Sequence, residues 1–243
     1  RTSSHSQFTI IIDHRIIAII ISFIIDTITM MATFFRFLIV ASVTITSSSL
    51  PVKVRVCTEA LCSDCKNFVH TTLIPVYSQL GPDVMDLQLV PFGNAHLQRD
   101  GSVKCQHGVG ECDANAYELC AIQASPNAKD YLPFIGCLAE TLPMGRSNEP
   151  LDQQLFQQCA ESNNLWWSRI QACHDIPQAI GNLVKKAASE TPADHTSVPW
   201  IEIEGDHMDE EKLDFKTEVC KAFVAGGGSH RACDGVLGTT QFG

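Results

Sequence analysis

The first regular pattern of hydrophobic and polar residues predicts two strands around a helix. Residues 52–56 (VKVRV) are rich in β-branched side chains, and residues 84–93 alternate between apolar and polar, as a half-buried strand does. Between them, residues 65–81 place apolar side chains at helical spacing, and Gly81 followed by a proline ends the pattern. Pro75 lies inside this helix, so we expect a kink or a break there. The order strand, helix, strand predicts a βαβ unit.

The rest of the chain predicts several helices, then one more strand and one more helix. Helical spacing recurs in residues 129–142, 151–160, 165–172 and 176–189. Before these stretches, residues 96–120 are polar and rich in cysteine, without long periodicity. Residues 197–205 predict a strand with Pro199 near its start, and residues 209–227 predict an amphipathic helix that ends at glycines. The stretch between the two strand-rich parts is therefore expected to be a helical insertion.

The first fifty residues differ from the rest because they contain long apolar runs. Residues 8–25 could be a membrane anchor, but they contain two charges and a histidine, which are costly inside a bilayer. From Met30 or Met31 onwards, a basic residue, an apolar run and small residues up to Ser49 predict a secretory signal peptide. Residues 1–29 are then an upstream segment. We expect no stable membrane association once the signal is removed.

Composition narrows the class of protein further. The chain has 243 residues and a net charge of −10, which disfavours nucleic acids and anionic membranes as partners because both require clustered Lys and Arg. Its eleven cysteines are scattered, which indicates an oxidising compartment and several disulfides. A structural zinc site is the alternative, but it would need a second CxxC-like pair, and the chain has one CxxC. We therefore expect no metal site.

Cys62 and Cys65 form that CxxC, directly after the first predicted strand and at the start of the predicted helix. The thiolate form of a cysteine attacks disulfides, and a helix N-terminus stabilises a thiolate. The second cysteine lies one turn further on, close enough to resolve a mixed disulfide. We therefore assign Cys62 as the nucleophile and Cys65 as the resolving thiol, in the opening βαβ unit of a thioredoxin-like fold. A structural disulfide or two free core cysteines remain the alternatives.

One cysteine-rich stretch carries a family resemblance. Residues 105–120, CQHGVGECDANAYELC, resemble the signature C-Q-H-G-x-x-E-C-x-x-N-x-x-x-x-C of gamma-interferon-inducible lysosomal thiol reductases, called GILT, and meet every fixed position. Residues 90–95, 192–200 and 219–233 are also similar to that family, in the same order. The resemblance implies a thioredoxin-like core with a helical insertion, and a reductase of disulfides in unfolding proteins. It implies acidic endosome- or vacuole-like compartments or secretion, and no metal or organic cofactor.

The resemblance and the element pattern together predict the domain organisation. The fold class is α/β, with a thioredoxin-like core and a helical, disulfide-rich insertion. An upstream segment and signal peptide are expected at 1–49, a single domain at 50–235 and a tail at 236–243. Within the domain, the core is expected at 50–95 and 194–225, and the insertion at 96–193.

Further site residues follow from the same fold. In thioredoxin-like folds a cis-proline precedes the strand that faces the CxxC, and its loop presents backbone to the substrate. We therefore assign Pro199 and Trp200 to substrate binding, with Trp200 lining the groove. Trp166 and Trp167 are expected to pack the insertion instead. The run of carboxylates at 209–211 is expected to be a solvated helix start.

The residues of the signature are expected to be structural. We interpret His107 as a hydrogen-bonded loop histidine rather than a general base beside Cys62. Glu111 and Asn115 are expected to serve as turn and capping groups. Within the CxxC, Asp64 places a negative charge near the nucleophile and should raise the pKa of Cys62.

The other cysteines are expected to be mostly paired. Removing the redox pair leaves nine, an odd number, and Cys57 is our choice for the unpaired thiol because the family usually has an aromatic residue near there. Such a thiol would be buried and inert, or would divert the active pair. Cys220 and Cys233 are expected to pair with each other. The remaining six allow fifteen connectivities, and the sequence does not choose among them; they are Cys105, Cys112, Cys120, Cys137, Cys159 and Cys173.

The sequence therefore predicts a thiol–disulfide oxidoreductase that reduces protein disulfides in the secretory and vacuolar or lysosomal pathway. Its partners would be disulfide-containing proteins and a small thiol that restores the reduced pair. An isomerase or an oxidase is a variant of the same chemistry, because direction depends on the reduction potential. The alternative from another class is a non-catalytic, disulfide-stapled secreted binding protein.

Overall fold

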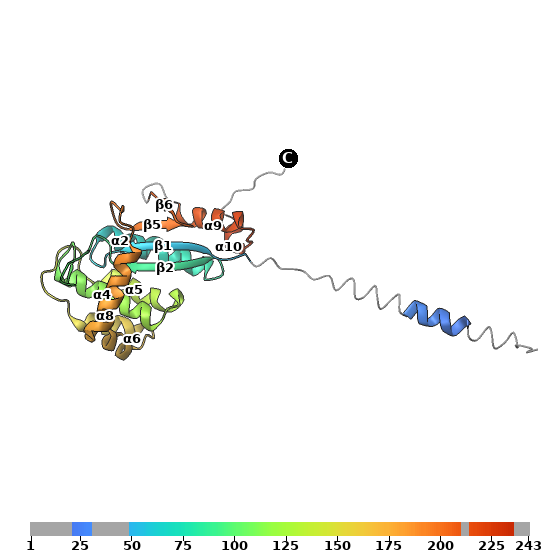
Figure 1. Ribbon diagram of the computed structural model, residues 1–243, viewed down its shortest axis with the longest axis horizontal. Coiled ribbons are helices and arrows are strands. Elements are labelled where there is room, and N and C mark those ends of the chain that lie inside the picture. Colours follow the sequence, from blue (N-terminus) through green and yellow to red (C-terminus); the bar gives the residue numbers. More distant parts are fainter. Residues whose placement is uncertain (1–20, 31–48, 210–213, 236–243) are drawn as a thin grey trace, which may run out of the picture. The chain divides into compact units, whose positions relative to one another are not determined.

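The computed structural model describes residues 21–30, 49–209 and 214–235. The chain divides into two units, residues 1–46 and 47–243. In the first unit, residues 21–30 form a helix (Figure 1). The expected signal peptide, most of the anchor considered at 8–25, the carboxylates at 210–211 and the tail lie outside the described residues. No helix in the described ranges is long and apolar enough to cross a membrane.

The core of the second unit is a four-stranded sheet with the order β2-β1-β5-β6. The central strand β1 (Val52–Thr58) runs parallel to β2 (Met85–Pro91) and antiparallel to β5 (Trp200–Ile203). The edge strand β6 (Asp206–Met208) runs antiparallel to β5. The three strands predicted from the sequence are confirmed, with ends shifted by a few residues. Because β1 is paired on both sides, its apolar side chains are almost entirely buried.

The helix after the CxxC is continuous but changes its winding. It begins as α2 (Ser63–Phe68), passes through a π-helical turn η1 (Val69–Leu73) and ends as α3 (Ile74–Leu80). The N–H of Ile74 donates to the carbonyl five residues earlier, and the next residue, Pro75, has no N–H to donate. The disturbance predicted at the proline is therefore confirmed, as a widened turn just before it.

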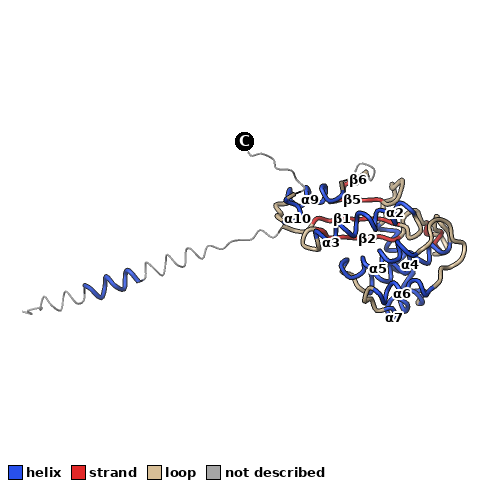
Figure 2. Tube along the Cα trace, turned by 180° about the vertical axis from the view of Figure 1, so that it is seen from behind, coloured by secondary structure: helices blue, strands red, loops and turns tan. Residues whose placement is uncertain are grey.

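The segment between β2 and β5 is mainly helical. A short hairpin comes first, made of β3 (His96–Leu97) and β4 (Val103–Lys104). Five helices follow: α4 (Val109–Ala124), α5 (Ala128–Thr141), α6 (Gln153–Ser162), α7 (Trp167–Asp175) and α8 (Pro177–Glu190). In Figures 1 and 2, α4, α5 and α6 lie beyond the β2 edge of the sheet, on the side away from β6. Both α4 and α8 contact β2.

The helix α9 (Phe215–Ala225) packs on the sheet, where it contacts β1 and β5, and α10 (Arg231–Asp234) packs on the helix α3. Asp214 caps α9 by accepting a hydrogen bond from the N–H of Thr217 at 3.2 Å. The predicted helix at 209–227 is confirmed at 215–225, whereas Asp209 lies outside it, so this carboxylate is not at a helix start.

The helix α4 begins inside residues 96–120, the stretch in which the sequence shows no long periodicity. Its apolar residues, such as Ala114 and Tyr117, are buried, and so are its polar residues Glu111, Asn115 and Glu118. A helix that is buried nearly all round has no polar face, so no helical period is visible in its sequence. Through Asn115, this helix contacts the loop that carries the CxxC.

Four disulfides fix the helices to one another. Cys120–Cys173 joins α4 to α7, Cys137–Cys159 joins α5 to α6, and Cys105–Cys112 closes the turn before α4. Cys220–Cys233 joins α9 to α10, as predicted. All eleven cysteines lie in the described ranges, and Cys57 is unpaired, as expected.

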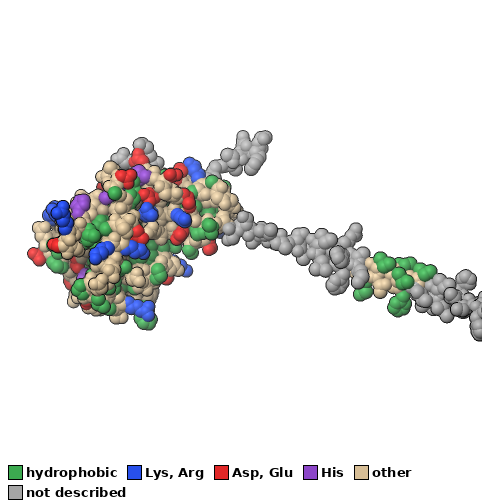
Figure 3. All heavy atoms as spheres, viewed as in Figure 1, with side chains coloured by type: hydrophobic (Ala, Val, Ile, Leu, Met, Phe, Trp, Pro, Cys, Tyr) green, Lys and Arg blue, Asp and Glu red, His purple; other side chains and the backbone are tan. Residues whose placement is uncertain are grey.

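Charged side chains of both signs are intermingled on the face that Figure 3 shows. An excess of acidic over basic residues gives the whole chain its net charge of −10. On this face the acidic side chains are spread among basic ones and do not form one patch.

Candidate active site

The two cysteines of the CxxC lie where a strand ends and a helix begins. Cys62 is the N-cap residue of α2, and its Sγ accepts the N–H of Cys65 at 3.5 Å. Both side chains are free thiols; Cys62 is 8% exposed and Cys65 is 1% exposed. Both residues are therefore buried at the helix N-terminus, Cys65 more completely than Cys62.

This environment lowers the pKa of Cys62 from 9.0 to about 6. The hydrogen bond with the Cys65 thiol is the main cause, and it outweighs burial, which raises the pKa. The backbone N–H groups of Cys65 and Asp64 at the helix start lower the pKa further. The Asp64 carboxylate raises it, as expected from the sequence, but is the smallest of these effects. At pH 5 about 10% of Cys62 would be thiolate.

Cys65 has the opposite character. Burial raises the pKa of its thiol well above 9.0, and the hydrogen bond to Cys62 and the charge on that sulfur add to the effect. Cys65 therefore keeps its proton while Cys62 is a thiolate. One activated and one protonated sulfur is the arrangement that a stepwise thiol–disulfide exchange requires.

A cis-proline loop lies against the nucleophile. The peptide bond between Val198 and Pro199 is cis, and the carbonyl oxygen of Val198 lies 3.9 Å from the Sγ of Cys62. Val198 was not singled out from the sequence, although its place before Pro199 was a usable signal. The ring of Trp200, at the start of β5, is buried and stacks on the ring of His207 in β6, with the ring centres 3.5 Å apart.

His107 is a hydrogen-bonded loop histidine, as expected. Its backbone N–H donates to Oε1 of Glu111 at 2.9 Å, and its Nδ1 contacts the other oxygen of the same carboxylate. Glu111 therefore does hold the turn before α4, at the first turn of that helix. Asn115 is different, because it lies inside α4 and its Oδ1 accepts the N–H of Ala60 at 2.9 Å. The prediction that Asn115 is a turn or capping group is wrong: it ties α4 to the CxxC loop.

Asn94 joins three stretches that resemble the family. Its backbone N–H donates to Oε1 of Glu59 at 2.7 Å, and its amide donates to Gln106 at 2.5 Å. Its Oδ1 lies 3.1 Å from Nε2 of His195, in the loop that leads to the cis-proline. Sequence reasoning missed Asn94 and Glu59. Glu59 had a signal, since it is a lone carboxylate between a buried strand and the CxxC.

A glycine makes this junction possible. Gly93 has φ of +53°, and a Cβ at this position would lie 2.3 Å from Cγ of Glu59. Any larger residue would therefore be strained in the backbone and would displace the Glu59 side chain.

Cys57 is separate from the redox pair. It is fully buried beside Trp200 in an apolar cluster that does not include Cys62 or Cys65. Burial raises the pKa of Cys57 to about 12, against a weaker opposing hydrogen bond with Thr191. Of the two expectations for this thiol, the structure favours the buried and inert one.

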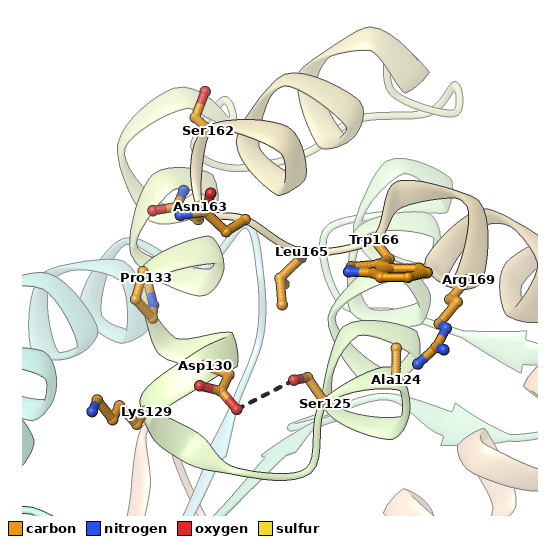
Figure 4. Close-up of a pocket in the computed structure, with 11 residues that line it drawn as sticks. Ala124, Ser125, Lys129, Asp130, Pro133, Ser162, Asn163, Leu165, Trp166 and Arg169 are labelled. Atoms are coloured by element: carbon orange, nitrogen blue, oxygen red, sulfur yellow. Dashed lines mark hydrogen bonds between the residues drawn. The ribbon is translucent and has the colours of Figure 1, made fainter.

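Trp166 does not pack the insertion, in contrast to the prediction, whereas Trp167 does. Trp166 is 68% exposed, and the guanidinium carbon of Arg169 lies 4.7 Å from its ring centre. Trp167 stacks on Tyr117 instead. Figure 4 shows Trp166 and Arg169 at one side of a cavity of about 530 Å³ between α4, α5 and the start of α7. Neither Cys62 nor Cys65 lines this cavity.

One group of acidic and histidine side chains is compact enough to surround a cation, within the part of the chain that the structure describes. The ligand atoms of Glu59, His107 and Glu111 lie within 4.8 Å of one another. Burial, and then the charge of Glu111, raise the pKa of Glu59 to about 8. The spacing of these atoms is the one observation that suggests a cation, so we do not assign a metal to this group.

The fold and the dithiol together define the class of the protein, that of thioredoxin-like thiol–disulfide oxidoreductases. Among solved structures, the chain is similar to reduced DsbA from Mycobacterium tuberculosis, with a TM-score of 0.55 and 17% identity. The similarity covers 76% of this chain and 87% of that one, and at this identity it supports the fold alone. The predicted thioredoxin-like fold class is thereby confirmed.

Sequence comparisons show similarity to one family over part of the chain. The model of the gamma interferon inducible lysosomal thiol reductase (GILT) family matches residues 53–163. A gamma-interferon-responsive lysosomal thiol protein of Arabidopsis thaliana is 29% identical over 71% of this chain and 71% of its own length. A gamma-interferon-inducible lysosomal thiol reductase of Carassius auratus is 32% identical. The aligned region covers 66% of this chain and 62% of that protein. These matches confirm the resemblance to the GILT family.

Proposed function

We propose that this protein reduces disulfides of other proteins through Cys62 and Cys65. The observation that carries the proposal is the position of Cys62, at a helix start and 3.9 Å from the carbonyl of the cis-proline loop. The thiolate of Cys62 attacks one sulfur of the substrate disulfide, and the other sulfur leaves and takes a proton. Cys65 then loses its proton and attacks Cys62, which releases the second substrate thiol. A small thiol restores the reduced pair.

The loop around Pro199 is our candidate for substrate binding. The Val198 carbonyl lies next to the nucleophile, so a peptide that pairs with this backbone would bring its disulfide to Cys62. Pro199 holds the loop in its cis form, and Trp200 anchors it to the sheet through its buried ring. The contact with the substrate would therefore be made mainly by backbone, which suits substrates of varied sequence.

We place this reaction in the secretory pathway, with secretion or the lysosome or vacuole as its end point. Four disulfides suit an oxidising compartment, and the names of the two relatives above include the word lysosomal. Because the pKa of Cys62 is lowered, about a tenth of the molecules would carry the reactive thiolate at pH 5.

A redox titration tests the proposal. In glutathione or dithiothreitol buffers, we expect the 62–65 pair to open and close reversibly, as followed by alkylation and mass spectrometry. The Cys105–Cys112 bridge serves as an internal control and should stay closed at the potentials where the pair opens. The stapled binding protein, the alternative function, requires a 62–65 disulfide that resists reduction over that range. Such resistance would rule out our mechanism.

Substitution of Asp64 should shift the pH dependence slightly. The Asp64 carboxylate raises the pKa of Cys62, whereas its backbone N–H lowers it and remains in an alanine variant. We therefore expect Asp64→Ala to move the rise of kcat/KM to lower pH and to increase the rate at pH 5 by less than about threefold. The exposed neighbour Ser63, changed to alanine, is the matched control. A pH–rate profile that Asp64→Ala leaves unmoved would contradict this electrostatic effect.

A further inference from the structure

His174 lies between two carboxylates at the end of α7. Its Nε2 lies 2.9 Å from Oδ1 of Asp113 in α4, and its Nδ1 lies 3.2 Å from Oδ1 of Asp175 in its own helix. The side chains of His174 and Asp113 are 22% and 16% exposed, whereas that of Asp175 is 56% exposed. Each ring nitrogen therefore faces a carboxylate, which accepts hydrogen bonds and has no proton to donate.

Only the charged form of this imidazole satisfies both contacts. A neutral imidazole has one N–H, so its other nitrogen would present a lone pair to a carboxylate oxygen. An imidazolium donates from both nitrogens, and hydrogen bonds between ionised partners are stronger than those between neutral ones. The two contacts therefore favour a positive charge on His174.

An aromatic ring from α4 covers one face of the same imidazole. The rings of His174 and Tyr117 are nearly parallel, at 3°, and their centres are 3.9 Å apart. Phe156 of α6 stacks on Tyr117 in turn, with the ring centres 4.1 Å apart. The face of an aromatic ring is electrically negative and attracts a cation that lies over it. The charged His174 thus binds α4 twice, through Asp113 and through Tyr117.

These neighbours change the acidity of the ring. Burial alone would lower the pKa of His174, but the hydrogen bonds to Asp113 and Asp175, together with their charges, raise the pKa above its ordinary value of 6.5. The nearest cation in the same helix, Arg169, lies over the ring of Trp166 at the other end of α7.

The other charged groups of the helices around α7 lie elsewhere along those helices. In α4, Glu111 contacts His107, and Glu118 interacts with Lys66. The helices α6 and α8 also contact α7, and their first turns hold no acidic residue. Their charged groups come later in each helix and are Glu161 in α6, and Lys185, Lys186 and Glu190 in α8.

We propose that His174 makes the packing of α7 on α4 depend on pH, so that this contact is strongest in acid and weakens as the pH rises through neutrality. A histidine whose pKa is higher in the folded state adds its full stability below the unfolded pKa of about 6.5, and that stability is lost as the pH rises through the folded pKa. The Cys120–Cys173 bridge joins the same two helices covalently, so His174 adds a reversible contact to a permanent one. The inference does not depend on the chemistry of the dithiol.

Denaturant unfolding of the full chain, with its disulfides intact, tests this at about pH 5.5 and about pH 8. We expect His174→Gln to increase the unfolding constant relative to the wild type at the lower pH, and this ratio to fall by about threefold or more at the higher pH. Other titrating groups are present in both proteins and cancel in the comparison. An unchanged ratio would overturn the inference.

The matched control is His70→Gln. His70 also lies 3.2 Å from a carboxylate, that of Glu140, but the two side chains are 53% and 61% exposed. Water screens such a pair, so the ratio of unfolding constants for this variant should hardly change with pH. An equal change in both variants would show that any histidine beside a carboxylate has the effect, and would overturn the special role of His174.

A nuclear magnetic resonance titration uses the unmodified protein and decides the matter even if His174→Gln does not fold. At about pH 6 the nitrogen shifts of His174 should show a proton on both ring nitrogens, and the titration midpoint should lie above that of a free histidine, about 6.5. Asp113→Asn should lower that midpoint, because it removes the charge of the less exposed partner. A wild-type midpoint at or below the free value, or one that Asp113→Asn leaves unmoved, would overturn the inference.

Discussion

Cys62→Ser is expected to lower kcat/KM for a denatured, disulfide-bonded protein by at least about a thousandfold. Serine has nearly the same size, but its hydroxyl does not ionise near neutral pH and cannot form the mixed disulfide. The Cys65 thiol and the backbone N–H groups that lower the pKa of Cys62 would then act on a hydroxyl that stays protonated. Turnover is measured with a fluorescent substrate whose disulfide quenches the signal, in an excess of a small thiol.

The control for this substitution is Cys57→Ala. Cys57 is the third free thiol, it is buried, and it belongs to a different apolar cluster from the redox pair. We expect activity within about threefold of the wild type, because the thiol that the alanine variant lacks is buried and does not ionise near neutral pH. Activity that survived Cys62→Ser, or that disappeared with Cys57→Ala alone in a folded protein, would contradict the assignment of the nucleophile.

The dithiol and its supporting elements could be predicted because their signals are local. A β-rich run, a CxxC and a helical period follow one another within thirty residues, and the structure keeps that order. The proline at 75 and the pairing of Cys220 with Cys233 were equally local. Pro199 was identified from its place at the head of a strand, and the structure gives it a cis bond.

The contacts of Glu59 with Asn94 and His107 could not be predicted, because tertiary structure brings these residues together. Glu59 follows β1, Asn94 follows β2, and His107 precedes α4, and no spacing along the chain relates them. The helix α4 showed no helical period in the sequence for a similar reason. Polar residues such as Asn115 lie on its buried faces, where they bind partners from distant segments. Trp166 shows the converse, because an aromatic residue inside a helical pattern turned out to lie at the surface.

Removal of the Cys120–Cys173 disulfide should cost the most stability of the four bridges. It closes the longest loop, with a sequence separation of 53 residues, and the loop-closure relation gives a loss of about 4 kcal/mol. The Cys105–Cys112 bridge closes only 7 residues, for which the same relation gives about 2 kcal/mol. We therefore expect Cys120→Ala/Cys173→Ala to lower the free energy of unfolding more than Cys105→Ala/Cys112→Ala, as measured by denaturant titration without reductant.

This prediction also tests how the insertion supports the dithiol. The Cys120–Cys173 bridge holds α4, the helix whose Asn115 accepts the N–H of Ala60 beside the CxxC. If α4 loosens as a unit, the double variant should also lose the thiolate absorbance of Cys62 at pH 7, because the loop that presents the helix start is no longer fixed. Equal losses of stability in the two double variants would show that strain or residual structure, and not loop length, sets the contribution of these bridges.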